Sequence, residues 1–170
     1  MKKTLLAIAV ATVALLAFRA LVLTIYTIEG AALEPTFKSG DRILVNRWSY
    51  GLRTGETDGL FGYGRLGFTM PDKGDIIAFD SPGASKIFVG RIKALPGDTI
   101  TTVQGPFLVP GEITCAEQNH YVVEMGKKRE LLAVPETNII GRVILIVYNH
   151  DNSRPFYSGY TPNRYCLQPE

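Results

Sequence analysis

The chain has 170 residues, of which 46% are hydrophobic and 20% charged, and this composition is typical of a globular protein and excludes a disordered one. The formal net charge is only +2 and the longest run of like charge is residues 127–129, so the sequence gives no support for nucleic-acid binding. The length predicts one domain with an appendage. The chain has 17 glycines and 10 prolines, which together with many Val, Ile and Tyr residues favour short strands and turns.

The N-terminal appendage is apolar. Lys2 and Lys3 precede residues 4–28, which are apolar except for Arg19. As an α-helix this stretch would be roughly 37 Å long at about 1.5 Å per residue, which is enough to cross a bilayer. Arg19 would then reach the outer interface or meet a partner helix.

A cleavable signal peptide is the alternative for this stretch. Phe18, two residues before Ala20, makes a poor small-x-small cleavage site, and the chain stays apolar beyond it. We therefore expect residues 1–28 to be a membrane anchor and residues 29–170 a single domain. Lysines before the anchor favour an N-terminus in the cytoplasm, which places the domain on the outer, periplasmic or extracellular side of the cell membrane.

Most of the domain is expected to be β-structure. β-branched and alternating runs between turn residues predict strands at residues 42–47, 74–79, 87–93, 99–103, 120–125 and 139–148. A Gly-rich loop at residues 53–73 is expected to contain a hairpin around residues 60–68. Turns at intervals of about 8–12 residues predict a mainly β fold, a coiled sheet or barrel.

The two cysteines, Cys115 and Cys166, have two possible states. In an oxidising compartment a disulfide between them is plausible, and it would stabilise the domain by about 4 kcal/mol by closing a loop of about 50 residues. Two free thiols are the alternative. The only histidines, His120 and His150, stand alone, so we expect no metal and no cofactor.

Four segments carry a recognisable pattern in a fixed order. The first contains Pro35 and Thr36, and the second begins at Gly40-Asp41. Residues 74–79 form a Gly-Asp strand, and residues 88–98 end in Leu-Pro-Gly-Asp. These segments resemble the conserved boxes of type I signal peptidases, peptidase family S26. The resemblance covers most of the domain and implies a signal-peptidase-like β fold.

The resemblance also implies where catalytic groups should lie. In the family a serine attacks the peptide bond and a lysine with a lowered pKa removes its proton. The serine position corresponds to Ala32 and the lysine position to Gly90, while Gly30 matches the residue that contributes to the oxyanion hole. Lys93 is close in sequence to Gly90, but its spacing along a strand predicts that it points to the opposite face.

The last box of the family is mostly missing. Met125-Gly126 opens it, and Arg129 corresponds to its final arginine. The acidic partner that precedes this arginine in the family is replaced by Lys127. Nucleophile, base and supporting acid are therefore all absent, which predicts a natural pseudoenzyme rather than a single engineered substitution.

A signal-peptidase-like domain without its dyad can still bind extended peptide beside strand edges. We therefore expect a membrane protein that binds a peptide or secreted precursor, or that assists secretion or surface-polymer assembly together with other membrane proteins. The expected peptide-binding and oxyanion region consists of Gly30, Ala31, Ala32, Leu33, Pro35, Ile87 and Arg91. The alternative is an active serine endopeptidase that uses another nucleophile, and Ser39, Ser81 and Ser85 are the candidates.

Overall fold

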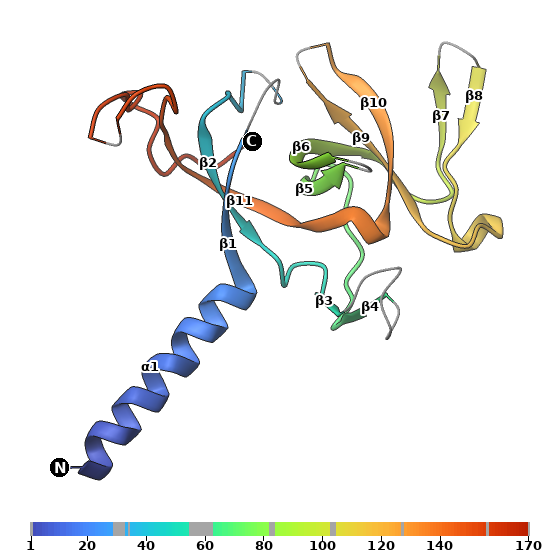
Figure 1. The fold of residues 1–170 in the computed structure, drawn as a ribbon. Helices are drawn as coiled ribbons and strands as arrows, with labels where there is room; N and C mark the ends of the chain where they lie inside the picture. Colours follow the sequence, from blue (N-terminus) through green and yellow to red (C-terminus); the bar gives the residue numbers. More distant parts are fainter. Residues whose placement is uncertain are drawn as a thin grey trace.

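The structure is a computed structural model that describes residues 2–28, 33, 35–54, 63–81, 84–102, 105–126, 128–155 and 157–169. Its main feature is a seven-stranded antiparallel sheet with the strand order β1-β2-β11-β5-β6-β9-β10 (Figure 1). The strands are β1 (Leu23–Thr27), β2 (Asp41–Asn46), β5 (Ile76–Ser81), β6 (Ala84–Ala94), β9 (His120–Met125), β10 (Glu130–Pro135) and β11 (Ile139–Asn149).

Two small hairpins and two short helical turns complete the domain. β3 (Leu52–Thr54) pairs with β4 (Gly64–Leu66), and β7 (Thr99–Thr102) pairs with β8 (Gly105–Leu108). The 3-10 turns η1 (Glu112–Thr114) and η2 (Glu136–Asn138) lead into β9 and β11. The β7–β8 hairpin lies at the end of the domain that is opposite to β1 (Figure 1).

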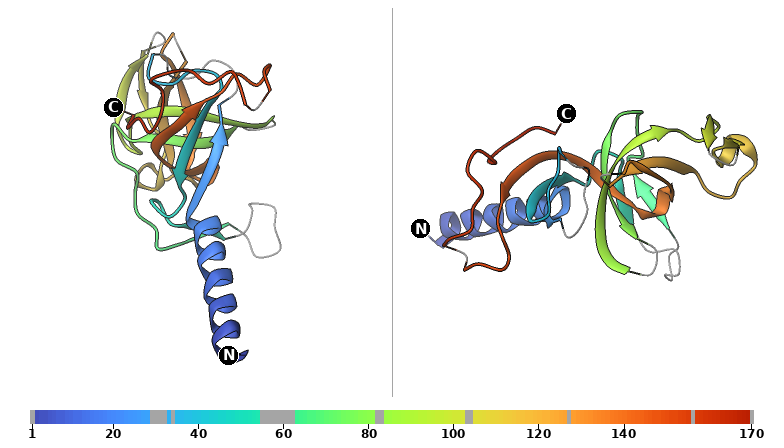
Figure 2. Two further views of the ribbon diagram at one scale, coloured as in Figure 1. Left: turned by 90° about the vertical axis from the view of Figure 1, so that its left-hand side faces the viewer. Right: turned by 90° about the horizontal axis from the view of Figure 1, so that it is seen from above.

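Helix α1 (Lys2–Val22) projects away from the sheet (Figures 1 and 2). Large apolar side chains are exposed along it: Leu5, Leu6, Ile8, Val10, Val13, Leu15, Leu16 and Phe18. Within the residues that the structure describes, no helix combines the length and the apolar character that crossing a bilayer requires.

The expected anchor over residues 1–28 is wrong at its C-terminal end. The helix stops at Val22, and residues 23–27 form β1, which pairs with β2 along its whole length. Thr24, Ile25 and Thr27 are β-branched, which favours a strand over a helix. Ile28 is then buried in the core of the domain, so this segment belongs to the β fold.

The sheet has a core on each face, as β5 illustrates. Ile76 and Ala78 belong to a cluster with Phe37 and Ile43, whereas Ile77 and Phe79 belong to a cluster on the other face. The second cluster also contains Tyr50, Ile92, Tyr121, Val123, Val134 and Ile139. Both faces of β5 are therefore buried.

The mainly β prediction is confirmed, and the predicted strands appear with small shifts at their ends. The hairpin expected around residues 60–68 differs in the structure: β4 lies within this range but pairs with β3, at residues 52–54, and residues 60–62 lie outside the described part of the chain. The strands β1, β3, β8 and β10 were not predicted. The described sheet runs from β1 at one edge to β10 at the other, so it is open rather than a closed barrel.

The expected disulfide is absent, because both cysteines are free and exposed. Cys115 follows η1, whereas Cys166 lies in the C-terminal tail, where its amide bonds to the carbonyl oxygen of Val147 on β11. The views of Figures 1 and 2 place η1 and this tail at opposite ends of the molecule. A disulfide needs Cα atoms within about 7 Å of each other, so this fold keeps the two cysteines apart.

We therefore expect alkylation of the native, unreduced protein to modify both Cys115 and Cys166. Each thiol is exposed, so no unfolding should be needed for the reagent to reach it. Mass spectrometry of the intact protein would count the added groups. A protein that takes up label only after reduction would show that the cysteines are bonded in solution.

Candidate functional site

The candidate site lies where the first box, residues 32–37, meets β6 and β9. Gly30, Ala31 and Ala32 lie outside the described residues, so the geometry at the nucleophile position stays open. Leu33 is half-buried against the core, and Phe37 is fully buried in it. The Phe37 amide donates to the Leu33 carbonyl oxygen at 2.9 Å, which holds the box in a tight turn.

A cavity of about 240 Å³ opens between these segments. Its walls come from the first box, from β6, and from β9 with the turn that follows it. The lining residues are Leu33, Pro35, Thr36, Arg91, Lys93, Glu124, Gly126 and Arg129. The structure thus brings Leu33, Pro35 and Arg91, three residues of the predicted peptide-binding region, into one cavity.

Glu124 organises the charges of this cavity. Its side chain is buried, and its two oxygens pair with two different cations: Oε2 lies 2.7 Å from Lys93 Nζ, and Oε1 lies 3.4 Å from Arg129 Nε. Arg91 lies opposite Glu124 in the strand ladder. Three basic groups and one carboxylate make the cavity cationic, which favours carbonyl or carboxylate oxygens over ammonium groups as ligands.

Gly90, at the family's base position, does not line this cavity. It is buried, and it pairs with Ile77 of β5 on the face of the second core cluster. A Cβ atom at Gly90 would overlap Val123 Cγ1 and would lie 2.9 Å from the backbone oxygen of Glu124. Lys93, in contrast, lines the cavity, which confirms that it points to the face opposite residue 90.

β6 presents an open edge next to the cavity. It pairs with β5 from Ala84 to Arg91, but its described pairing with β9 begins only at Arg91. In the described part of the chain, residues 84–89 therefore have one edge without a partner strand. Ile87, which lies on the unpaired segment 84–89, packs on the same core cluster as Leu33. Leu33 of the first box and Ile87 therefore lie on the same face of the sheet.

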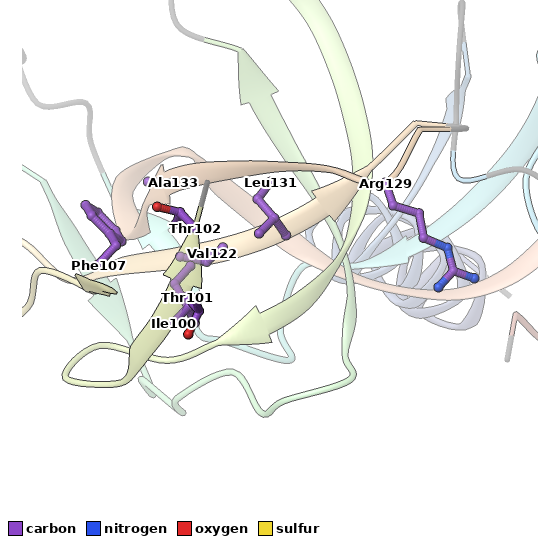
Figure 3. A pocket seen from close by; sticks show the side chains of 8 residues that line it. All are labelled: Ile100, Thr101, Thr102, Phe107, Val122, Arg129, Leu131 and Ala133. Carbon is purple, nitrogen blue, oxygen red and sulfur yellow. The ribbon is translucent and has the colours of Figure 1, made fainter. Parts of the chain in front are cut away.

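A second, larger cavity of about 590 Å³ lies between the β7–β8 hairpin and β9–β10. Its lining is mostly apolar, with Ile100, Thr101, Thr102, Phe107, Val122, Leu131 and Ala133. Arg129 lines both cavities, and Figure 3 places it at the opposite end of this cluster from Phe107. This cavity could not be expected from the sequence, because β8 and β10 were not predicted.

The Pro96-Gly97-Asp98 turn, part of the fourth matching segment, has a structural role. Gly97 has a φ of 86°, a left-handed conformation that favours glycine. The Asp98 carboxylate accepts hydrogen bonds from Lys73 Nζ at 2.9 Å and from the Leu95 amide at 2.7 Å. These bonds hold the pKa of Asp98 below its usual value and fix the chain where β6 ends.

The C-terminal tail contributes an unexpected contact to the second box. Asp41 is fully buried, and Arg164 binds it through two bonds: Nε to Oδ1 at 2.7 Å and Nη2 to Oδ2 at 2.6 Å. Asn149 Nδ2 also donates to Asp41 Oδ1 at 2.8 Å. The hydrogen bond with Asp41 raises the pKa of the Arg164 guanidinium. Sequence reasoning missed Arg164, because nothing in its neighbourhood resembles a motif.

The antiparallel sheet thus brings the first box, the fourth matching segment and the remnant of the last box to one cationic cavity. The family model for signal peptidase, peptidase S26, matches residues 1–139. The chain belongs to this family.

Individual signal peptidases are also similar to this chain in sequence. The chain is 32% identical to signal peptidase IB of Staphylococcus aureus over 170 residues, covering 91% of this chain and 80% of the relative. It is 31% identical to signal peptidase I of Pseudomonas aeruginosa over 100 residues, or 58% of this chain and 34% of the relative. The match to a probable signal peptidase I-2 of Synechocystis is 25% identical over 147 residues, or 82% of this chain and 57% of the relative. The chain thus spans well under two thirds of these last two proteins.

Proposed function

We propose that this protein is a catalytically inactive member of the signal peptidase family that binds extended peptide segments of secreted precursors. The carrying observation is the pair of residues at the family's dyad positions, Ala32 and Gly90. Neither has a side chain that can attack a carbonyl or accept a proton. The packing of β9 against Gly90 supports this proposal, because it fills the space that a lysine would need.

The cationic cavity also favours binding over catalysis. Lys93 is the lysine that lines the cavity, and its ammonium pairs with Glu124. A general base needs a free lone pair, whereas an ion-paired ammonium supplies only charge and hydrogen-bond donors. The same donors suit the carbonyl oxygens of a bound peptide.

We expect the purified protein to leave a preprotein with a small-x-small cleavage site intact. The assay would incubate both and follow the precursor by gel electrophoresis and mass spectrometry, with an active signal peptidase as the positive control. Loss of precursor that persists in the variant Lys93→Ala would indicate a contaminating protease. Specific cleavage that Lys93→Ala or Ser39→Ala abolishes would instead make the protein an enzyme.

The binding half of the proposal rests on the open edge of β6. Backbone N–H and C=O groups along residues 84–89 can pair with an added strand, and this capacity does not depend on the missing serine and lysine. Leu33 and Ile87 lie on the same core cluster beside this edge. A peptide with small side chains at alternate positions would fit without displacing them.

We expect such a peptide to bind weakly, with a Kd of about 1 μM to 1 mM, because a few net hydrogen bonds and little apolar burial support no more. In an NMR titration of the isotope-labelled protein, the amides of residues 33–37 and 84–90 should shift. A peptide of the same length with proline at alternate positions is the control, since its proline nitrogens cannot donate hydrogen bonds along the edge. Unmoved amides at saturating peptide would exclude this binding mode.

One observation favours the alternative of an active endopeptidase. Thr36 and Lys93 line the same cavity, so a hydroxyl and a lysine are present beside the first box. The candidates from the sequence fare less well: Ser39 is exposed, with its carbonyl oxygen bonded to Asn149, and the side chains of Ser81 and Ser85 are not described. The variant Thr36→Val, tested in the cleavage assay, separates the two functions.

A location outside the cytoplasm and an association with lipid or with other membrane or assembly proteins remain part of this proposal. They are supported by Lys2 and Lys3 before α1 and by the exposed apolar side chains along that helix. Cell fractionation, with protease added to intact spheroplasts, would locate the domain. Full protection of the domain in cells whose outer face is accessible would exclude an outward position.

A further inference from the structure

The C-terminal tail, residues 150–169, reaches back across the sheet to the first and second boxes. Its Arg164 binds both oxygens of Asp41, and Nη2 of the same guanidinium donates to the Thr36 carbonyl oxygen at 2.7 Å. Thr36 lines the candidate peptide-binding cavity. One side chain of the tail therefore bonds directly to the backbone of the segment that forms the cavity wall.

The contact between Arg164 and Asp41 is buried rather than exposed on the surface. The side chain of Asp41 is fully buried and that of Arg164 is 12% exposed. Asp41 Oδ2 also accepts from the Lys38 amide of the same turn at 2.7 Å, and Oδ1 accepts from Asn149 at the end of β11. A bidentate guanidinium–carboxylate pair fixes direction as well as distance, which a single ammonium cannot do.

The tail itself is anchored along β11. The Ile146 amide donates to the Leu167 carbonyl oxygen at 2.8 Å, the Cys166 amide donates to Val147, and Thr161 Oγ1 donates to Asn149 Oδ1 at 2.6 Å. The tail is thus bonded to β11 both before and after Arg164 in the sequence. The family match ends at residue 139, so the tail lies outside the part of the chain that the family model describes.

We infer that Arg164 is a positioning residue, through which the C-terminal tail holds the first box in the conformation that binds peptide. This inference rests on the proposed peptide-binding function. It assigns the tail a role in setting the affinity of a site built by other segments. Removing the guanidinium frees the Thr36 carbonyl and leaves the Asp41 carboxylate with fewer partners, so the turn of residues 35–41 gains alternative conformations.

The test compares the full chain with its variant Arg164→Ala. Peptide affinity, measured by the NMR titration described above, should fall about 2- to 30-fold. Amide hydrogen exchange should speed up at Phe37 and Lys38, whose N–H groups bond within this turn, and should stay slow in β5 and β9. The affinity and the exchange rates of Arg164→Lys should lie between those of the two proteins. Lysine keeps the positive charge but cannot form the two parallel hydrogen bonds of a guanidinium.

Two matched variants separate positioning from general destabilisation. Arg154→Ala removes another arginine of the tail, one that is exposed and pairs only on the surface with Asp151. Ile77→Val weakens the core on the other face of the sheet without touching the first box. Both should bind peptide as the wild type does.

Each outcome decides the inference. Equal affinity and equal exchange at Phe37 and Lys38 in Arg164→Ala and the wild type would overturn it, and so would an equal loss of affinity in Ile77→Val. A wild-type protein that binds no peptide would refute the proposed function, and the exchange rates at Phe37 and Lys38 would then decide alone whether Arg164 positions the turn.

Discussion

Replacing Gly90 with lysine, the family's residue, is expected to destabilise the protein rather than restore activity. The new Cβ would overlap Val123 and crowd the backbone oxygen of Glu124, so β9 would have to move away from β6. The ammonium would also enter the apolar cluster around Ile77 and Ile92. Overpacking costs about 1–3 kcal/mol, and an unpaired buried charge adds at least about 3 kcal/mol.

Gly90→Ala isolates the packing part of this loss, and we expect about 1–3 kcal/mol from urea unfolding. Gly64→Ala in β4 is the matched control, because its Cβ would meet only Thr54, at 3.0 Å from the side-chain hydroxyl and 3.8 Å from the backbone oxygen. A second substitution, Val123→Ala, removes the overlapping methyl group, so the double variant should lose less than the sum of the single losses. A Gly90→Ala protein as stable as the wild type would show that β6 and β9 are less closely packed.

The close packing at Gly90 also affects which substitutions could restore peptidase activity. A family lysine at position 90 would have to be accommodated by changes on β9, not only by Ala32→Ser. The double variant Ala32→Ser/Gly90→Lys is therefore expected to remain inactive in the cleavage assay. The packing of β9 against Gly90 thus supports the proposed binding function.

The sequence predicted those parts of the fold in which a local pattern decides the structure. The Gly-Asp turns, the alternation in β2 and the strand pattern of β9 are all local, and the structure confirms these strands. β1 was misassigned because it continues an apolar helix without a break, and its β-branched residues become a recognisable strand only beside its partner β2. β10 was missed because residues 130–133 are exposed, so they show no buried face.

At the site, sequence reasoning found the segments but not their long-range partners. It placed Leu33, Pro35 and Arg91 in one region, and the cavity contains all three. It also predicted the direction of Lys93 from strand periodicity alone. The pairing of Asp41 with Arg164 joins residues 123 apart in the chain, and no spacing rule predicts such a contact. The prediction of a disulfide was wrong for the same reason. An oxidising compartment and a closed loop of suitable length do not determine how far apart two cysteines lie in the fold.

Asp41→Ala is expected to cause a large loss of stability. Its carboxylate is fully buried and receives bonds from Arg164, from Asn149 and from the Lys38 amide. Removing one partner of a buried ion pair leaves the other charge uncompensated, which costs about 3–5 kcal/mol. This is a large share of the 5–15 kcal/mol (roughly) by which a domain is stable.

Asp80→Ala provides the surface comparison, because Asp80 pairs with Arg53 at 3.1 Å and its side chain is 46% exposed. Its loss should be below about 1 kcal/mol. In the double variant Asp41→Ala/Arg164→Ala the unpaired guanidinium is gone, so the loss should be smaller than the sum of the two single losses. Urea unfolding of the wild type, of Asp80→Ala, of the two single variants and of the double variant would measure these losses. An Asp41→Ala loss no greater than that of Asp80→Ala would contradict the assignment of Asp41 and Arg164 as the link between the tail and the first box.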